Sequence, residues 1–161
     1  MLGIWARTQA AQHQADPPFR VLSPADAREI EAIASGIIPS DTSPGAREAG
    51  AVYFIDRALE TFDRSQRPLY QRGLAEAQAT RRKLFPASRD IASLPTADRI
   101  SLLKAIETTE FFEAIRVHTI MGFLADPAYG GNRGQVGWQH IGLQHAHRFD
   151  PPFGHYDQDP Q

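Results

Sequence analysis

Hydrophobic residues recur along this chain every three or four positions, which is the spacing of one face of an α-helix. Five segments show this pattern, and stretches rich in Pro, Ser and Gly separate them. The expected helices run from Ser23-Pro24 to near Pro39, and then over about 46–62, 68–85, 97–107 and 110–125. No segment alternates like a β-strand. The sequence therefore predicts an all-α fold, a compact bundle of about five helices with extended N- and C-terminal arms.

The expected fifth helix is the most apolar segment. Its apolar residues are Phe111, Phe112, Ile115, Ile120, Met121 and Phe123. A helix of this composition is expected at the centre of the bundle. Gly50 lies inside the expected second helix, where it costs about 1 kcal/mol relative to alanine. We interpret it as a point of close approach between helices.

The chain divides into a helical domain, 23–143, and two arms. Residues 1–22 are rich in Gln, Ala and His, and two consecutive prolines interrupt any helix, so we expect a flexible N-terminal arm. Residues 144–161 are expected to form an extended C-terminal arm in which Phe149, Phe153 and Tyr156 stand among prolines. Aromatic residues are frequent interface anchors. We therefore expect this arm to lie on a partner or back on the bundle.

Composition narrows the class of protein. The chain has 161 residues, about the size of one domain, and its hydrophobic and charged fractions of 42% and 22% are those of a globular protein. A net charge of −2 argues against a basic surface for nucleic acid. The absence of cysteine excludes disulfides, thiol nucleophiles and thiolate metal ligands.

Histidines supply the first candidate chemistry. Four of the six lie in the last part of the chain: His140, His145, His147 and His155. His145 and His147 could bind a metal together with Asp150 or Asp157. Their spacing fits no established zinc motif, however, so we favour polar positions in an extended arm. A small metal-dependent enzyme stays open as an alternative.

Other polar residues favour structural roles. His118 shares a helical face with Phe111, which is typical of a core histidine that has a hydrogen-bond partner, in preference to a general base. Glu48 and Asp56 share the expected second helix and have arginine neighbours, so we expect solvated ion pairs. The basic run 81–83 is expected to be a solvated helix end.

The glycine-rich stretch 130–134 is superficially similar to a phosphate-binding loop. It follows an expected helix, whereas such loops follow a strand, and it lacks the Gly-Lys-Ser/Thr ending. No serine stands in a nucleophile elbow. We therefore assign no catalytic, cofactor-binding or metal-binding residue to this chain.

Three stretches together resemble one family. They are 31–39, 42–56 and 122–133, and the last is followed by Gly137-Trp138. In this order and at these separations they are similar to the gluconate 2-dehydrogenase subunit 3 family, over about Ser23 to Leu143. The ending 151–157 resembles the small subunits of bacterial glucoside 3-dehydrogenases.

The resemblance implies a small subunit without a redox centre. In that family a large FAD-containing subunit of the glucose-methanol-choline oxidoreductase class oxidises the sugar or polyol, and a c-type cytochrome subunit, where present, takes the electrons. The small subunit serves maturation and export of the large one, often through a twin-arginine signal, which implies a periplasmic, membrane-associated complex. No such signal is visible before the first expected helix. A trimmed chain, export through the partner's signal and a cytoplasmic complex therefore stay open.

The expected function is a non-catalytic subunit that binds, stabilises and helps to mature a flavin-dependent sugar dehydrogenase. The candidate partner contacts are Tyr129, Gly130, Gly131, Asn132 and Trp138 in the loop, and Phe149, Phe153 and Tyr156 in the arm. Packing of these residues within the chain itself is the competing interpretation. A helical adaptor with an unrelated partner is a further alternative.

Overall fold

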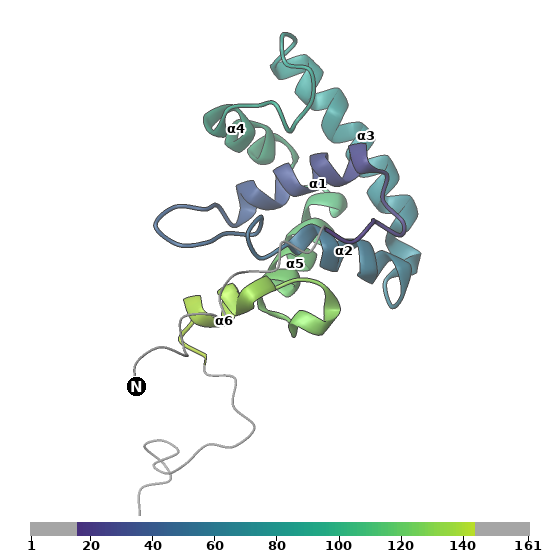
Figure 1. Cartoon of the computed structure of the whole chain (residues 1–161). Coiled ribbons are helices and arrows are strands. Elements are labelled where there is room, and N and C mark those ends of the chain that lie inside the picture. Colours follow the sequence, from purple (N-terminus) through teal and green to yellow (C-terminus); the bar gives the residue numbers. More distant parts are fainter. Residues whose placement is uncertain (1–15, 144–161) are drawn as a thin grey trace, which may run out of the picture.

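The computed structural model describes residues 16–143 and contains six α-helices within that range (Figure 1). They are α1 (Pro24–Ile37), α2 (Ala51–Glu60), α3 (Arg67–Leu84), α4 (Thr96–Ile106), α5 (Glu110–Leu124) and α6 (Val136–His140). Short 3₁₀ turns, η2 (Arg64–Gln66), η3 (Pro127–Tyr129) and η4 (Arg133–Gln135), join some of them. The predicted all-α fold is confirmed, and the sequence pattern missed only the short α6 among the α-helices described.

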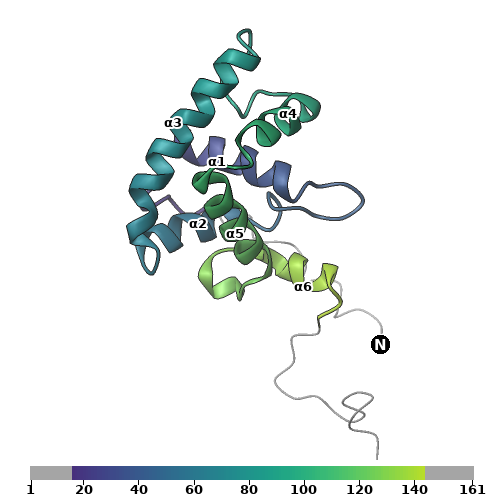
Figure 2. The same ribbon diagram turned by 180° about the vertical axis from the view of Figure 1, so that it is seen from behind.

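The fifth helix lies at the centre of the molecule, as its composition predicted. It contacts α1, α2, α3 and α6. It lies behind α2 in Figure 1 and in front of it in Figure 2, which views the molecule from the other side. α4 packs against α1 and α3 at one end, and α6 packs on α5 at the other. The bundle is therefore organised around α5 and its long contact with α2.

Apolar residues from every long helix meet in one core. The largest side chains that are completely buried include Ile30, Ile33, Ile55, Leu59, Ile91, Leu102 and Ile115. Burying an aliphatic side chain of this size contributes roughly 1.5–3 kcal/mol relative to leaving it exposed. Many of these residues stand at the positions that the helical spacing marked.

Side-chain caps fix the starts of two helices. The Ser23 hydroxyl accepts a hydrogen bond from the Asp26 amide at 3.1 Å, and proline follows it at the first position of α1. The Thr109 hydroxyl accepts from the Phe112 amide at 3.1 Å at the start of α5. Each cap satisfies an amide that has no acceptor within its helix.

The second helix begins later than the sequence predicted. Residues 46–50 form turns, and α2 starts at Ala51 because Gly50 has a left-handed backbone with a φ of +66°. A Cβ atom on Gly50 would lie 2.6 Å from Cδ of Arg133. The glycine therefore serves a turn, and the predicted close approach of two helices there is wrong. Glu48 and Asp56 consequently do not share a helix.

Part of the predicted N-terminal arm is fixed to the bundle. Residues 16–22 form no helix or strand, but the ring of Phe19 stacks on Tyr53 with a centroid separation of 4.8 Å. Residues 1–15 lie outside the described part.

Asp56 holds this segment to α2. Its carboxylate accepts hydrogen bonds from the amides of Arg20, Val21 and Leu22 at 2.8–2.9 Å. Its side chain is buried, so the predicted solvated ion pair at Asp56 is wrong. The sequence offered no sign of these partners, which lie more than thirty residues earlier in the chain.

Candidate functional site

The loop between α5 and α6 contains most of the predicted contact residues. Asn132 stands at its centre, fully buried and with a left-handed backbone at a φ of 44°. Its side-chain amide donates to the Ala125 carbonyl at 3.0 Å, and its side-chain oxygen accepts from the Gly137 amide at 2.8 Å. Asn132 thereby links the end of α5 to the start of α6.

Two further loop residues also pack on α5. A Cβ atom on Gly131 would lie only 2.1 Å from the Gly122 carbonyl oxygen, so only glycine allows the loop to approach the helix this closely. The indole of Trp138 is largely buried and donates to the Leu124 carbonyl at 2.6 Å. These contacts explain why the sequence has glycine and tryptophan at these positions.

The predicted contact residues thus divide into two groups. Gly131, Asn132 and Trp138 pack within the chain, and Gly130 lies against the side chain of Arg57. Tyr129 is 59% exposed and is free to meet another molecule. The other predicted contacts, Phe149, Phe153 and Tyr156, lie outside the described residues. Partner contact therefore stays a prediction, and within the described loop it depends on Tyr129.

Arg133 connects this loop to the N-terminal segment. Its guanidinium carbon lies 3.7 Å from the centroid of the Tyr53 ring, and its Nη1 lies 2.5 Å from the Asp16 carboxylate. Its amide donates to the Ala49 carbonyl at 3.0 Å. Burial, with the nearby Asp16 charge, raises the pKa of Tyr53, so its hydroxyl stays neutral. Sequence reasoning missed this cluster because its members are far apart in the chain.

A buried hydrogen-bonded chain lies between α3 and α5. Nδ1 of His118 lies 2.7 Å from the Tyr70 hydroxyl, and Nε2 lies 2.8 Å from an Asp63 carboxylate oxygen. His118 is a core histidine with hydrogen-bond partners, as predicted. Burial, with a contribution from Asp63, raises the pKa of Tyr70 above its usual range. Tyr70 and His118 are buried, whereas the Asp63 side chain is 34% exposed, so these hydrogen bonds tie α3 to α5 in the core and reach the surface at Asp63.

A groove of about 370 Å³ lies between the N-terminal segment, α1 and α3. It is lined mostly by apolar side chains, among them Val21, Leu22 and Leu74. The three charged residues at its wall have partners in the chain. Arg67 donates to the Leu59 carbonyl, Glu29 accepts from the Ile91 amide, and Asp26 accepts from the Ser23 hydroxyl. Burial raises the pKa of Glu29. The groove therefore presents no evident pair of reacting groups.

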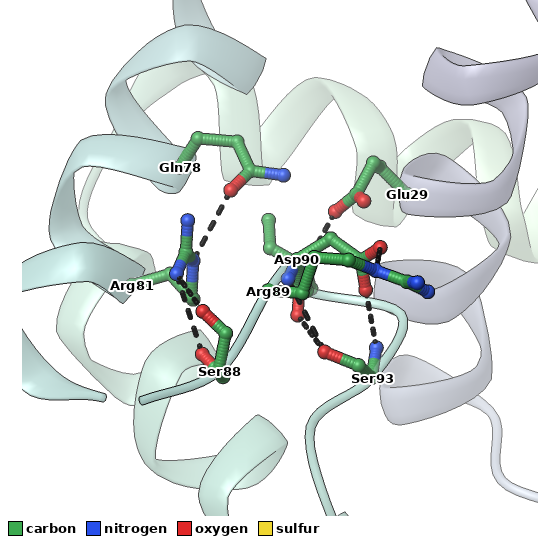
Figure 3. A network of polar contacts seen from close by, with 8 residues as sticks. Glu29, Gln78, Arg81, Ser88, Arg89, Asp90 and Ser93 are labelled. Atoms are coloured by element: carbon green, nitrogen blue, oxygen red, sulfur yellow. Dashed lines mark hydrogen bonds and ion pairs between the residues drawn. The ribbon is translucent and has the colours of Figure 1, made fainter. Parts of the chain in front are cut away.

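A polar network fixes the segment between α3 and α4 (Figure 3). Arg81 donates to the Ser88 carbonyl and to the Gln78 side chain. Arg81 is buried, so the prediction of a wholly solvated basic run is wrong, although Arg82 and Lys83 are exposed. The network satisfies backbone groups of the connecting segment, and its contacts are structural.

Asp90 and Ser93 continue the network in the same segment. Their side chains exchange hydrogen bonds with each other's backbone at 2.8–3.2 Å. The Glu29 carboxylate reaches this segment from α1 through the Ile91 amide at 2.8 Å (Figure 3). The connection is therefore fixed from both α1 and α3.

The predicted histidine-rich region is mostly outside the described residues. His140, at the end of α6, lies edge-on to Phe123 with a centroid distance of 6.1 Å. Residues 16–143 contain no group of three His, Asp or Glu side chains suited to hold a metal ion. In the same range, no helix has the length and apolar character needed to cross a membrane. His145, His147, His155, Asp150 and Asp157 are not described.

Comparisons with known proteins identify the family. A family model described as Gluconate 2-dehydrogenase subunit 3 matches residues 24–144, which include all six helices. Neither the curated proteins nor the solved structures that were searched gave a significant match. The likeness to glucoside 3-dehydrogenase subunits stays a prediction, whereas the broader resemblance is confirmed. The chain belongs to the gluconate 2-dehydrogenase subunit 3 family, and its family description makes it a subunit of a dehydrogenase complex.

Proposed function

We propose that this chain is the non-catalytic small subunit of an FAD-dependent dehydrogenase that oxidises a sugar or glycoside. The observation that carries the proposal is the family match across the entire helical body. In this proposal the FAD belongs to a large partner subunit of the glucose-methanol-choline class. Electrons leave that subunit for a c-type cytochrome or another electron-transfer subunit.

The proposed action of the small subunit is physical. By binding only the folded, FAD-loaded large subunit, it stabilises that state by mass action, with a gain of about 2.7 kcal/mol at a concentration of 100 times Kd. An obligate interface of this type usually buries more than about 2,000 Å². Tyr129 in the loop and the aromatic residues of 144–161 are proposed as parts of it.

We further propose that the small subunit assists maturation and export of the large one. The complex would then act in the periplasm and meet the membrane through its other subunits. Cell fractionation of a strain that expresses both subunits tests this location. Flavoprotein that reaches the periplasm equally well when the small subunit is deleted would contradict the export role.

Co-expression with a candidate flavoprotein, sought among the genes that neighbour the one for this chain, tests the central proposal. We expect the two proteins to co-elute in size exclusion, with flavin absorbance in the shared peak. Deletion of 144–161 should weaken or abolish the co-elution. The truncated chain needs a melting curve like that of the full chain, so that loss of binding is not confused with loss of folding.

Two results would overturn the proposal. One is a flavoprotein that folds, binds FAD and oxidises sugars alone while the small chain elutes separately. The other is stoichiometric zinc or iron in the untagged chain, measured by elemental analysis, because it would favour the metal-dependent enzyme.

A further inference from the structure

Residues 16–22 precede α1 and lie along α2 (Figure 1), and we refer to them as the strap. None of them is buried, because Phe19, Val21 and Leu22 are half-buried and the others are exposed. Among the described residues, no backbone group of the strap is hydrogen-bonded to another backbone group. The strap is therefore held to the bundle by contacts that involve side chains.

One carboxylate holds the end of the strap that leads into α1. One oxygen of Asp56 accepts from the Val21 and Leu22 amides at 2.9 Å, and the other accepts from the Arg20 amide at 2.8 Å. Asp56 is only 2% exposed. A buried charge is costly unless it is hydrogen-bonded. The Asp56 carboxylate and the strap therefore hold each other in place.

Aromatic stacking holds the middle of the strap. The Phe19 ring stacks on the Tyr53 ring of α2, with a centroid separation of 4.8 Å and an angle of 13° between the planes. The guanidinium carbon of Arg133 lies 3.7 Å from the centroid of the same Tyr53 ring, and Arg133 also pairs with Asp16. Asp16 is exposed, so this outer attachment is open to solvent.

The start of α1 is stabilised separately from the strap. The Ser23 hydroxyl accepts from the Asp26 amide, and the Ser23 carbonyl accepts from the Ala27 amide at 2.9 Å. Ala27 and Ile30 are buried in the core. These interactions do not involve 16–22, so α1 can keep its first turn when the strap leaves α2. Segments with few buried contacts open at a lower free energy than the whole fold.

The strap also forms part of the groove of about 370 Å³ described above. Val21 and Leu22 belong to its lining, and the rest of the lining comes from α1, α2 and α3. When the strap leaves α2, the groove loses these two side chains. Access to the groove therefore depends on the position of the strap.

We propose that the strap opens as one unit while the helical bundle stays folded, and that its opening controls access to the groove. Asp56 is the latch, because it accepts hydrogen bonds from three consecutive amides of the strap. The hinge lies between Leu22 and Ser23, where the cap of α1 begins. The proposal requires no partner subunit, so its tests on the free chain are separate from those of the proposed function.

Native-state hydrogen exchange of the full chain tests whether the strap opens as a unit. We expect the amides of Arg20, Val21 and Leu22 to share one opening free energy and to be at least about tenfold less protected than the Ile115 amide in the core. Their exchange should change little in low urea, because opening the strap exposes little surface. If the three amides follow the protection and urea dependence of Ile115, or differ widely from one another, the proposal is overturned.

Substitution of Asp56 tests the latch. Asp56→Asn replaces one accepting oxygen by an amide nitrogen that cannot accept a hydrogen bond, so protection of the three strap amides should fall by about tenfold or more. Glu60→Gln is the matched control. It lies on α2 and loses an exposed ion pair with Arg20, so its effect should stay below about threefold.

A second variant keeps this test decisive if Asp56→Asn disturbs the bundle, which circular dichroism would reveal. Phe19→Ala removes the stack on Tyr53 from an unburied position, and protection of the strap amides should fall by about 3- to 10-fold. Unchanged protection of these amides in a folded Asp56→Asn chain overturns the latch. Unchanged protection in Phe19→Ala overturns the role of the stack in closing the strap.

Thiol labelling tests control of the groove. The chain has no cysteine, so Leu74→Cys places a single thiol in the groove lining, and Leu102→Cys places one in the core outside that lining. With the thiol reagent DTNB, we expect Leu74→Cys to react faster than Leu102→Cys, with little dependence on low urea, and faster still when Asp56→Asn is added. Equal urea dependence of the two thiols, or no response of Leu74→Cys to Asp56→Asn, would overturn the control of access.

Discussion

The inner and outer sides of α5 both carry apolar residues, yet these residues have different surroundings. The outer side bears Val117, Ile120, Met121 and Leu124 together with the charged Glu110 and Glu113. Ile115 on the inner side is completely buried against the core. Ile120, only five residues later on the outer side, remains substantially exposed. Burial of apolar area is what stabilises a fold. The inner side therefore contributes more to the stability of this chain than the outer side does.

This difference shows that an apolar residue on a helix does not always contribute to the stability of the fold. An apolar residue of either side would look equally suited to a core in the sequence. Substitutions on the two sides should thus change the stability of the folded chain by different amounts.

The largest expected effect comes from truncating a residue of the inner side. Ile115→Ala should lower the free energy of unfolding by about 2–5 kcal/mol, because it leaves a cavity in the core. The matched variant Ile120→Ala should change it by no more than about 0.5 kcal/mol. Urea denaturation of the two free chains measures both. Similar losses for the two variants would contradict the division between the two sides.

A somewhat smaller effect is expected where the loop is tied to the end of α5. Asn132→Ala leaves the Ala125 carbonyl and the Gly137 amide without their side-chain partner, so we expect a loss of about 2 kcal/mol. Hydrogen exchange at the Gly137 amide should become faster. Tyr129→Ala, in the same loop but exposed, should leave both measurements nearly unchanged. Unchanged protection of the Gly137 amide in Asn132→Ala would refute the role given to that side chain.

Local patterns in the sequence predicted most of the fold. The spacing of Ile30, Ile33, Ile55 and Leu59 marked buried positions correctly, since helical periodicity is a property of neighbouring residues. His118 was placed in the core on the same basis. The capped start of α1 was also predictable.

Two of the errors arise where distant parts of the chain meet. The late start of α2 depends on the left-handed Gly50, which packs against Arg133. The burial of Asp56 depends on amides more than thirty residues earlier. No local pattern contains either contact.

The candidate contact surface shows the same limit. Glycine, asparagine and tryptophan in the loop were visible in the sequence, but their packing on α5 was not. The outer side of α5 had one available signal, the spacing of Val117, Ile120, Met121 and Leu124 opposite a second apolar stripe. Which of two apolar stripes is covered depends on the tertiary structure, so the sequence could not choose between them.

The smallest expected effect concerns a buried charged group. Burial of an apolar side chain stabilises the fold, whereas burial of a charged side chain destabilises it. Burial is the main cause that raises the pKa of Glu29 above 4.5, and the nearby Asp90 adds to it. The folded chain therefore holds this proton more tightly than the unfolded chain, and Glu29 reduces stability as the pH rises from about 4.5 through the raised pKa. Glu29→Gln keeps an oxygen for the Ile91 amide and does not titrate. Its stability relative to wild type should thus increase over that pH range.

Glu48 is the matched control because its pKa is shifted the other way. The main cause that lowers the pKa of Glu48 is the Ser40 hydroxyl, which lies 2.5 Å from a Glu48 carboxylate oxygen. The charged form therefore stabilises the fold above pH 4.5. This contribution is lost as the pH falls through the lowered pKa. Glu48→Gln should therefore lose stability relative to wild type as the pH rises. Thermal unfolding between pH 3 and 7 measures both trends. Parallel trends for the two variants would contradict the environments assigned to Glu29 and Glu48.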